Sequence, residues 1–153
     1  MSSDCCSASE TTRKETVFCP RCCEKGKPIS LATVGAMART DVEAAQLSAH
    51  EYKVCRNRDC PVVYYAAQIE LEKNELRVPV NFKEQHYDGP ICYCFNHTVA
   101  SIKAEVKARG HSTTPEMINR EVRAGRCACE VKNPAGSCCL GDVTRVVQAL
   151  VAI

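Results

Sequence analysis

Cysteine is the residue type in this sequence that can do the most chemistry, since 13 of the 153 residues are cysteines. Such a content indicates either a framework of disulfides or the binding of metal, and each belongs to a different redox compartment. The N-terminal segment MSSDCCSASETTRKETVF has no apolar stretch that would direct secretion. No later run approaches the roughly 20 apolar residues that span a bilayer. We therefore expect a cytoplasmic protein without membrane insertion, whose reduced thiols bind metal.

The first set of cysteines consists of two pairs in the N-terminal half. Cys19 and Cys22 form a C-x2-C turn, and Cys55 and Cys60 form a C-x4-C turn. Each pair places two thiolates beside a strand-like segment, which is typical of a four-thiolate zinc ribbon or knuckle. Four protein ligands leave no open position, so a zinc ion here would stabilise the fold rather than catalyse hydrolysis. A redox-active dithiol and cysteines without metal are the alternatives, and Cys23 remains as a spare thiol.

The second set begins with Cys92 and Cys94, which are separated by one residue. After a predicted pair of helices, the segment RCACEVKNPAGSCCLGD supplies Cys127, Cys129, Cys138 and Cys139. Side chains at i and i+2 of an extended segment project to the same side, so a C-x-C motif presents two thiolates to one object. Thiolates from two segments suit a cluster of two irons and two sulfides, and a second zinc site is the alternative. Spacing leaves open which cysteine of each later pair would be the ligand.

The elements that must position these cysteines differ between the two halves. Polar residues 1–15 are expected to be a flexible tail. Three strand-sized apolar runs follow, with a short helix or a loop at 40–51 between them: they are ISLATV at 29–34, EYKVC at 51–55 and PVVYYAA at 61–67. The segment at 68–80 alternates apolar and charged residues around Lys73 and Asn74, which predicts a hairpin or one extended arm.

Beyond Gly89 and Pro90 the apolar residues follow a helical period, which predicts three helices. Their expected ends rest on residues that commonly cap or terminate helices: Thr98 and Gly110 for the first, Thr114 with Pro115 and Gly125 for the second, and Asp142 for the start of the third. We therefore predict an α+β protein with a small β-rich, zinc-ribbon-like domain at 16–88 and a helical domain at 89–153 that binds a [2Fe-2S] cluster.

The remaining composition limits the function classes. The 20 basic and 18 acidic residues give a net charge of +2, so no general electrostatic attraction to nucleic acid is expected. No carboxylate pair, Ser/His/Asp set or phosphate-binding glycine loop indicates a turnover enzyme. His97 and His111 are expected to be capping or surface residues. We therefore expect a metal-binding or electron-transfer protein whose partners recognise particular sites.

In combination, these motifs resemble a known family. The order C-x-C, C-x9-C and NPAGSCC looks like the iron–sulfur half of CopZ-type copper chaperones, which is related to the bacterioferritin-associated ferredoxin (BFD-like) fold. CPRC followed by VCRNRDCPVVYY is similar to the zinc-binding segment of that family. The resemblance covers about residues 17–150. It implies two sets of ligands: Cys19, Cys22, Cys55 and Cys60 for zinc, and Cys92, Cys94, Cys129 and Cys139 for a helical, BFD-like [2Fe-2S] domain.

The resemblance implies a role in metal homeostasis, with copper as the expected metal. The cluster would transfer single electrons, for example to reduce Cu(II) to Cu(I), and partners would be redox or metal-trafficking proteins such as a copper carrier or transporter. Family members with two domains also carry an M-x-C-x-x-C loop, whereas the C-x-x-C of this chain follows Phe18, so we expect no copper delivery by such a loop. The alternatives are a BFD-like docking or sensing module for a larger enzyme or metal store, and sequestration of soft metal by the remaining thiols: Cys5, Cys6, Cys23, Cys127 and Cys138.

Overall fold

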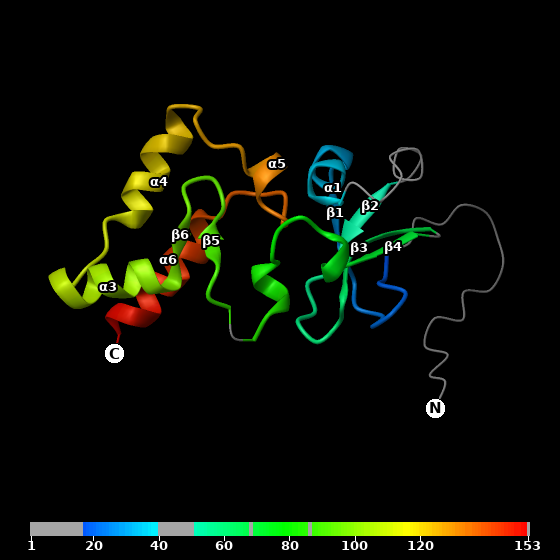
Figure 1. Ribbon diagram of the computed structural model, residues 1–153, viewed down its shortest axis with the longest axis horizontal. Coiled ribbons are helices and arrows are strands. Elements are labelled where there is room, and N and C mark those ends of the chain that lie inside the picture. The colour runs from blue at the N-terminus through cyan, green and yellow to red at the C-terminus, as the bar shows by residue number, and fades with distance from the viewer. Residues whose placement is uncertain (1–16, 40–50, 68, 86, 153) are drawn as a thin grey trace. The chain divides into compact units, whose positions relative to one another are not determined.

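The computed structural model describes residues 17–39, 51–67, 69–85 and 87–152. The chain divides into two compact units, Met1–Gln85 and His86–Ile153. Strands dominate the first unit and helices the second, as Figure 1 shows. The tail expected at 1–15 and the segment expected at 40–51, except Glu51, lie outside the described residues. Within the described ranges, every helix is too short or too polar to cross a membrane.

The first unit is built on an antiparallel sheet of four strands in the order β1-β2-β3-β4. All five residues of β3 are buried, which explains why this strand reads as an unbroken run of valine, tyrosine and alanine. The strands expected at 51–55 and 61–67 are therefore confirmed. The bounds are Lys27–Ile29 for β1, Tyr52–Val54 for β2, Val62–Ala66 for β3 and Ile69–Glu72 for β4.

The strand expected at 29–34 is wrong for most of its length, because helix α1 (Leu31–Met37) begins there. Ser30 caps this helix, since its hydroxyl oxygen accepts a hydrogen bond from the backbone N–H of Thr33 at 3.2 Å. Val34 and Met37 face the core from the helix. A short apolar run does not distinguish a strand from a buried helix by its period, and here the cap decides.

Of the segment expected at 68–80, the described residues 69–80 follow the extended alternative rather than the hairpin. After β4 a 3-10 turn, η1 (Lys73–Glu75), forms, with the Glu75 carboxylate accepting the N–H of Glu72 at 2.8 Å. Leu76 then pairs with Ala38 in an isolated antiparallel bridge, which carries the chain to α1 instead of back along β4. A second 3-10 turn, η2 (Asn81–Lys83), follows the buried Val80.

The second unit packs a two-stranded ribbon against helices. Its bounds are Pro90–Cys92 for β5, His97–Thr98 for β6, Val99–Arg109 for α3, Thr114–Arg123 for α4, Cys129–Lys132 for α5 and Leu140–Val151 for α6. The core takes one or two residues from β5, α3, α4 and α6, and it includes Cys92 and Cys139. Two of the cysteines with predicted ligand roles thus lie at the centre of this unit.

The ends of α3 and α4 agree with the sequence at three positions. The Thr98 hydroxyl accepts the N–H of Ser101 at 3.0 Å, and Gly110 ends α3 in the left-handed region at φ +78°. Pro115 lies in the first turn of α4. The expected cap at Thr114 is wrong by one residue: Thr113 holds the cap position, and its N–H donates to the Glu105 carboxylate at 3.0 Å. A side chain from α3 replaces the local cap.

The expected start of the third helix at Asp142 is also wrong. Helix α6 begins at Leu140, with Cys139 in the cap position and Asp142 in its first turn, where the Asp142 carboxylate forms an ion pair with Arg145. The Cys139 carbonyl accepts the N–H of Val143 at 3.0 Å, and both side chains are buried. Burial of these two side chains, rather than a polar cap, determines where α6 starts.

Candidate metal centres

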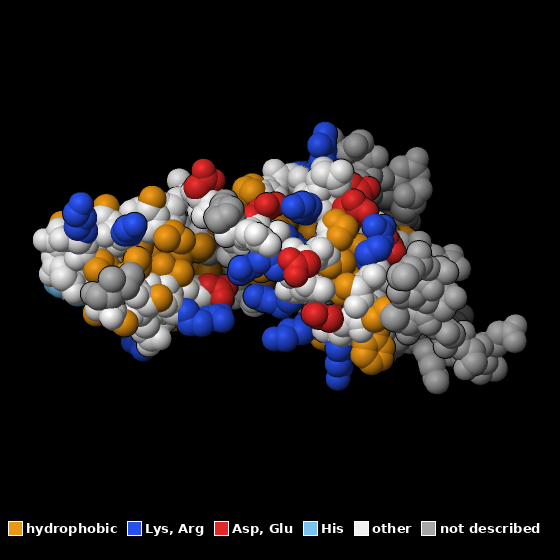
Figure 2. All heavy atoms as spheres, turned by 90° about the horizontal axis from the view of Figure 1, so that it is seen from below, with side chains coloured by type: hydrophobic (Ala, Val, Ile, Leu, Met, Phe, Trp, Pro, Cys, Tyr) orange, Lys and Arg blue, Asp and Glu red, His pale blue; other side chains and the backbone are white. Residues whose placement is uncertain are grey.

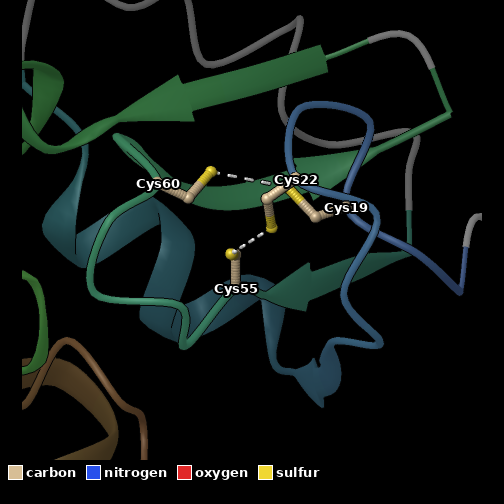
Figure 3. Close-up of side chains that lie close together, drawn as sticks. All are labelled: Cys19, Cys22, Cys55 and Cys60. Carbon is tan, nitrogen blue, oxygen red and sulfur yellow. Dashed lines mark hydrogen bonds between the residues drawn. The ribbon is translucent and has the colours of Figure 1, made fainter. Parts of the chain in front are cut away.

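The four cysteines of the first set converge in the strand-rich unit. Figure 3 shows their side chains pointing toward one another, and all four sulfurs lie within 4.8 Å of each other. The Sγ atoms of Cys19 and Cys60 are 3.8 Å apart, and those of Cys22 and Cys55 are 3.6 Å apart. Four thiolates placed tetrahedrally at about 2.3 Å from zinc are about 3.8 Å from one another. The four sulfurs are thus close enough together to bind one metal ion such as zinc.

Two turns bring these sulfurs together. In the first, the N–H of Cys19 donates to the Glu24 carbonyl at 2.8 Å, and the N–H of Cys23 donates to the Cys19 carbonyl at 2.9 Å. In the second, Cys55 follows β2 directly, and its N–H donates to the Val63 carbonyl at 2.8 Å. The sheet therefore holds the second pair, and backbone hydrogen bonds hold the first.

Arg21 connects the first turn to the sheet. It lies between the two cysteines of C-P-R-C, and its guanidinium contacts the carboxylates of Glu70 at 3.0 Å and Glu72 at 3.1 Å. Both glutamates belong to β4. Because all three side chains are partly exposed, each pair contributes little to stability, but together they restrict the orientation of the turn.

Tyr65 supports the site from the sheet, and the motif search did not identify it. Its side chain is fully buried beside Cys19, Cys55 and Cys60. The hydroxyl donates to the Val17 carbonyl at 2.6 Å and accepts the N–H of Gly26 at 3.0 Å. A Cβ atom on Gly26 would lie 2.2 Å from the Tyr65 oxygen, so only glycine fits there. Burial raises the pKa of Tyr65 to about 12, which keeps the hydroxyl protonated as a donor.

Burial also controls protonation of the thiols. It raises the pKa of Cys19 and that of Cys60. Burial acts in the same direction on Cys22, but hydrogen bonds from the Glu24 backbone and the Asn57 side chain help to lower its pKa overall. Thiols with raised pKa values hold protons unless a cation displaces them. The set would therefore gain its full negative charge by exchanging protons for a metal ion.

The cysteines of the second set meet as two pairs in the helical unit. The Sγ atoms of Cys94 and Cys129 are 3.4 Å apart, and the Cys94 sulfur accepts the N–H of Ala128 at 3.2 Å. The Cys139 thiol donates a hydrogen bond to the Cys92 sulfur, which lowers the pKa of Cys92 to about 6 and raises that of Cys139. Burial raises the pKa of Cys129 to about 12.

Backbone N–H groups surround the Cys92 sulfur. Those of Cys94, Phe95 and His97 all favour its thiolate form. They come from the turn between β5 and β6 and from the first residue of β6, and Asn96 in this turn adopts a positive φ of 58°. The turn after Cys92 therefore directs several backbone donors at this one sulfur, which the spacing of the C-x-C motif alone did not indicate.

The NPAGSCC segment folds around the side chain of Asn133, which is almost completely buried. Its Nδ2 donates to the Ser137 carbonyl at 2.8 Å, and its Oδ1 accepts the N–H of Ala135 at 2.9 Å. Gly136 takes φ +67° and donates its N–H to the Asn133 carbonyl at 2.8 Å. The resulting turn leads Cys139 to the buried start of α6.

Burial distinguishes the two cysteines within each of the later pairs, for which the sequence left the ligand open. Cys129 and Cys139 are buried, whereas Cys127 is half-buried and Cys138 is exposed. The structure therefore directs Cys129 toward Cys94 and Cys139 toward Cys92. His111 is an exposed residue whose ring nitrogen lies 3.1 Å from the Arg109 carbonyl, as expected for a surface histidine.

Charged side chains of both signs are mixed on the face drawn in Figure 2, where Lys and Arg lie among Asp and Glu. Nucleic-acid-binding surfaces instead present a run of basic side chains to the phosphates. Acidic side chains lie among the basic ones on this face, in agreement with the nearly balanced charge of the chain.

Comparison with known proteins gives three related results. Residues 16–77 match the CopZ-type family model described as "Zinc binding domain". The copper chaperone CopZ of Archaeoglobus fulgidus is 30% identical over 129 residues, covering 84% of this chain and 60% of the relative. The X-ray structure of the A. fulgidus CopZ N-terminal domain superposes with a TM-score of 0.69 at 28% identity, covering 84% of this chain and 96% of that one.

These results show a CopZ-like N-terminal domain with a zinc-binding region of the CopZ type. All four cysteines of the first set fall within the residues matched by the zinc-binding family model. The second set lies beyond the end of that match. The chain spans 60% of the length of the curated relative.

Proposed function

Because the chain is similar to the N-terminal domain of CopZ, we propose that it is a two-centre metalloprotein of copper homeostasis in the cytoplasm. Zinc would be bound by Cys19, Cys22, Cys55 and Cys60, and a [2Fe-2S] cluster by Cys92, Cys94, Cys129 and Cys139. The zinc centre would stabilise the fold. The cluster would accept and donate single electrons.

The observation that supports the cluster most is the pairing of its sulfurs. Among the described residues, the first set alone brings three or more ligand atoms within 4.8 Å of one another. The second set instead forms the separate pairs Cys94 with Cys129 and Cys92 with Cys139. Two thiolates on each of two irons match this arrangement better than four thiolates on one ion.

The surroundings of these sulfurs also fit an anionic cluster. Ala128 donates a backbone N–H to Cys94, and several N–H groups favour the thiolate of Cys92. Hydrogen bonds to the sulfurs are one of the factors that set the potential of such clusters. Cys92 and Cys139 lie in the apolar core of the unit, which excludes water from one side.

We infer Cu(II) as the substrate of the electron transfer. When bound, the cluster supplies one electron at a time, and one electron converts Cu(II) into the Cu(I) that thiolate carriers accept. The reaction oxidises the cluster by one electron, so a low-potential electron-donor protein must reduce it again. The partners are therefore such a donor and a copper carrier or transporter.

This proposal is tested by mixing anaerobic, dithionite-reduced protein, freed of excess reductant, with Cu(II) and a Cu(I)-specific chromophoric chelator. One Cu(I) per reduced cluster is expected, together with return of the visible absorption of the oxidised cluster. Cys92→Ala should abolish both signals, whereas Cys138→Ala should leave them unchanged. Cu(I) formation in the Cys92→Ala variant at the wild-type yield would assign the reduction to free thiols and contradict the proposal.

Sequestration of soft metal is a second candidate, because Cys138 is exposed and Cys127 is half-exposed. Thiolates bind Cu(I) without any redox centre. This function predicts stoichiometric Cu(I) uptake that is lost when both cysteines are replaced by serine while iron is retained. Unchanged uptake in that double variant would contradict it.

A further inference from the structure

Lys83 is a charged residue in an unexpected environment. It ends the 3-10 turn η2, and its side chain is only 3% exposed. Among the described residues, no carboxylate forms an ion pair with its ammonium group. Burying a lysine charge without a negative partner is costly, and proteins rarely retain it. The burial of Lys83 therefore needs a compensating negative group.

The only hydrogen bond of the Lys83 ammonium that the described residues provide is to the backbone carbonyl of Asn57, at 2.7 Å. The same carbonyl accepts the N–H of Cys60 at 3.2 Å. The Asn57 side chain bonds the Cys22 sulfur and also accepts the N–H of Asp59 at 3.0 Å. Lys83 thus holds Asn57, which contacts a cysteine from each pair of the candidate zinc site.

A neighbouring contact strengthens this attachment. The Arg56 guanidinium lies 4.8 Å from the centre of the Phe82 ring, a cation–π distance. Consecutive residues of the C-x4-C turn, Arg56 and Asn57, therefore contact consecutive residues of η2, Phe82 and Lys83. Val80 is buried in the core of the unit and fixes η2 in turn.

We propose that Lys83 is a positioning residue of the zinc site, which compensates the charge of the metal centre and holds the C-x4-C turn through Asn57. Zinc with four thiolates is a doubly negative centre, so it supplies the negative charge that Lys83 lacks. This inference rests on the zinc site proposed above. It extends that site beyond residue 77, where the match to the zinc-binding family model ends.

Three substitutions separate the charge from the hydrogen bond: Lys83→Met removes both, Lys83→Gln keeps a donor without charge, and Lys83→Arg keeps the charge. The exposed Lys27→Met in β1 is the matched control. Zinc affinity of the full chain is measured by competition with a chromophoric chelator. Loss of an outer-shell partner lowers metal affinity about 10- to 100-fold. We expect that loss for Lys83→Met, an intermediate loss for Lys83→Gln, and values nearest the wild type for Lys83→Arg and Lys27→Met.

Cobalt substitution provides a readout that general destabilisation would not change. The sulfur-to-cobalt charge-transfer bands report how strongly the thiolates donate, so they should shift in Lys83→Met and Lys83→Gln and stay near the wild type in Lys83→Arg. Wild-type affinity and bands in Lys83→Met would overturn the inference. So would weaker binding with unshifted bands and no rescue by arginine. If the wild-type chain itself binds no zinc, the proposed zinc site fails instead, which is a different result.

Discussion

Replacing Tyr65 by phenylalanine tests how the sheet supports the zinc site, because it removes one oxygen and leaves the ring in place. The hydroxyl makes two hydrogen bonds, to the Val17 carbonyl at 2.6 Å and from the Gly26 N–H at 3.0 Å. Gly26 is buried, so its N–H would lose its partner without reaching water, which costs about 1–3 kcal/mol. Val17 is half-buried, and loss of its bond costs about 0.5–1.5 kcal/mol.

Together these losses predict that Tyr65→Phe lowers the free energy of unfolding of the strand-rich unit by about 2–4 kcal/mol. Because metal binding is coupled to folding, the same loss should weaken the apparent zinc affinity about 30- to 700-fold if the metal-free unit is largely unfolded. The assays are urea unfolding at fixed free zinc, followed by circular dichroism, and chelator competition for zinc.

Tyr93→Phe is the matched control, since the Tyr93 hydroxyl lies 3.1 Å from that of Tyr87 in the helical unit. It should leave zinc affinity unchanged. A Tyr65→Phe protein that unfolds within about 0.5 kcal/mol of the wild type, a change typical of an ordinary surface substitution, would refute the assigned role of the hydroxyl.

Three further predictions concern other parts of the molecule. Gly26→Ala should reduce zinc retention at least as much as Tyr65→Phe, measured by metal analysis after dialysis, because its Cβ would lie 2.2 Å from the Tyr65 oxygen; wild-type retention would contradict the close approach. Glu105→Gln should destabilise the helical unit at pH 7 by about 1–2 kcal/mol in urea unfolding, after allowance for solvent screening. Hydrogen bonds from residues 112–114 lower the Glu105 pKa to about 2 from an ordinary 4.5. The stabilisation by this carboxylate is therefore complete above about pH 4.5 and is lost as the pH falls toward about 2. Equal stability of the wild type and Glu105→Gln at pH 7 would exclude this stabilisation. Cys139→Ser should remove iron and the visible absorption, whereas Cys138→Ser should retain both, and the reverse result would exchange their roles.

Local signals in the sequence predicted a large part of the fold. The buried strand β3 and the ends of α3 follow from residue types that act within a few positions, such as the Thr98 cap and Gly110. Cys19 and Cys22 lie on one turn because only two residues separate them. These features needed no knowledge of distant contacts.

The errors arose where distant contacts determine the local structure. The start of α4 depends on Glu105, a carboxylate eight residues before Thr113 on another helix. Helix α6 starts early because Cys139 is buried, which polar capping signals do not reveal. For α1, an apolar run of six residues could not show whether it was a strand or a helix until the Ser30 cap was seen.

The supporting residues of the candidate zinc site were missed for the same reason. Tyr65 was noted only as part of a strand, and no sequence motif indicated a role for Lys83. Both act through contacts with residues far away in sequence, Tyr65 with Val17 and Lys83 with Asn57. A buried lysine carries the same letter as an exposed one, so only the structure distinguishes it.

The central claim is that one chain holds a zinc ion and a two-iron cluster at separate sets of cysteines. The most direct test is metal and sulfide analysis with a visible absorption spectrum of anaerobically purified protein, repeated for Cys92→Ala and Cys19→Ala. Our account predicts about two irons, two sulfides and one zinc per chain, with iron lost only in Cys92→Ala and zinc only in Cys19→Ala. A colourless wild-type protein with two zinc ions and no iron, even after cluster reconstitution, would contradict it.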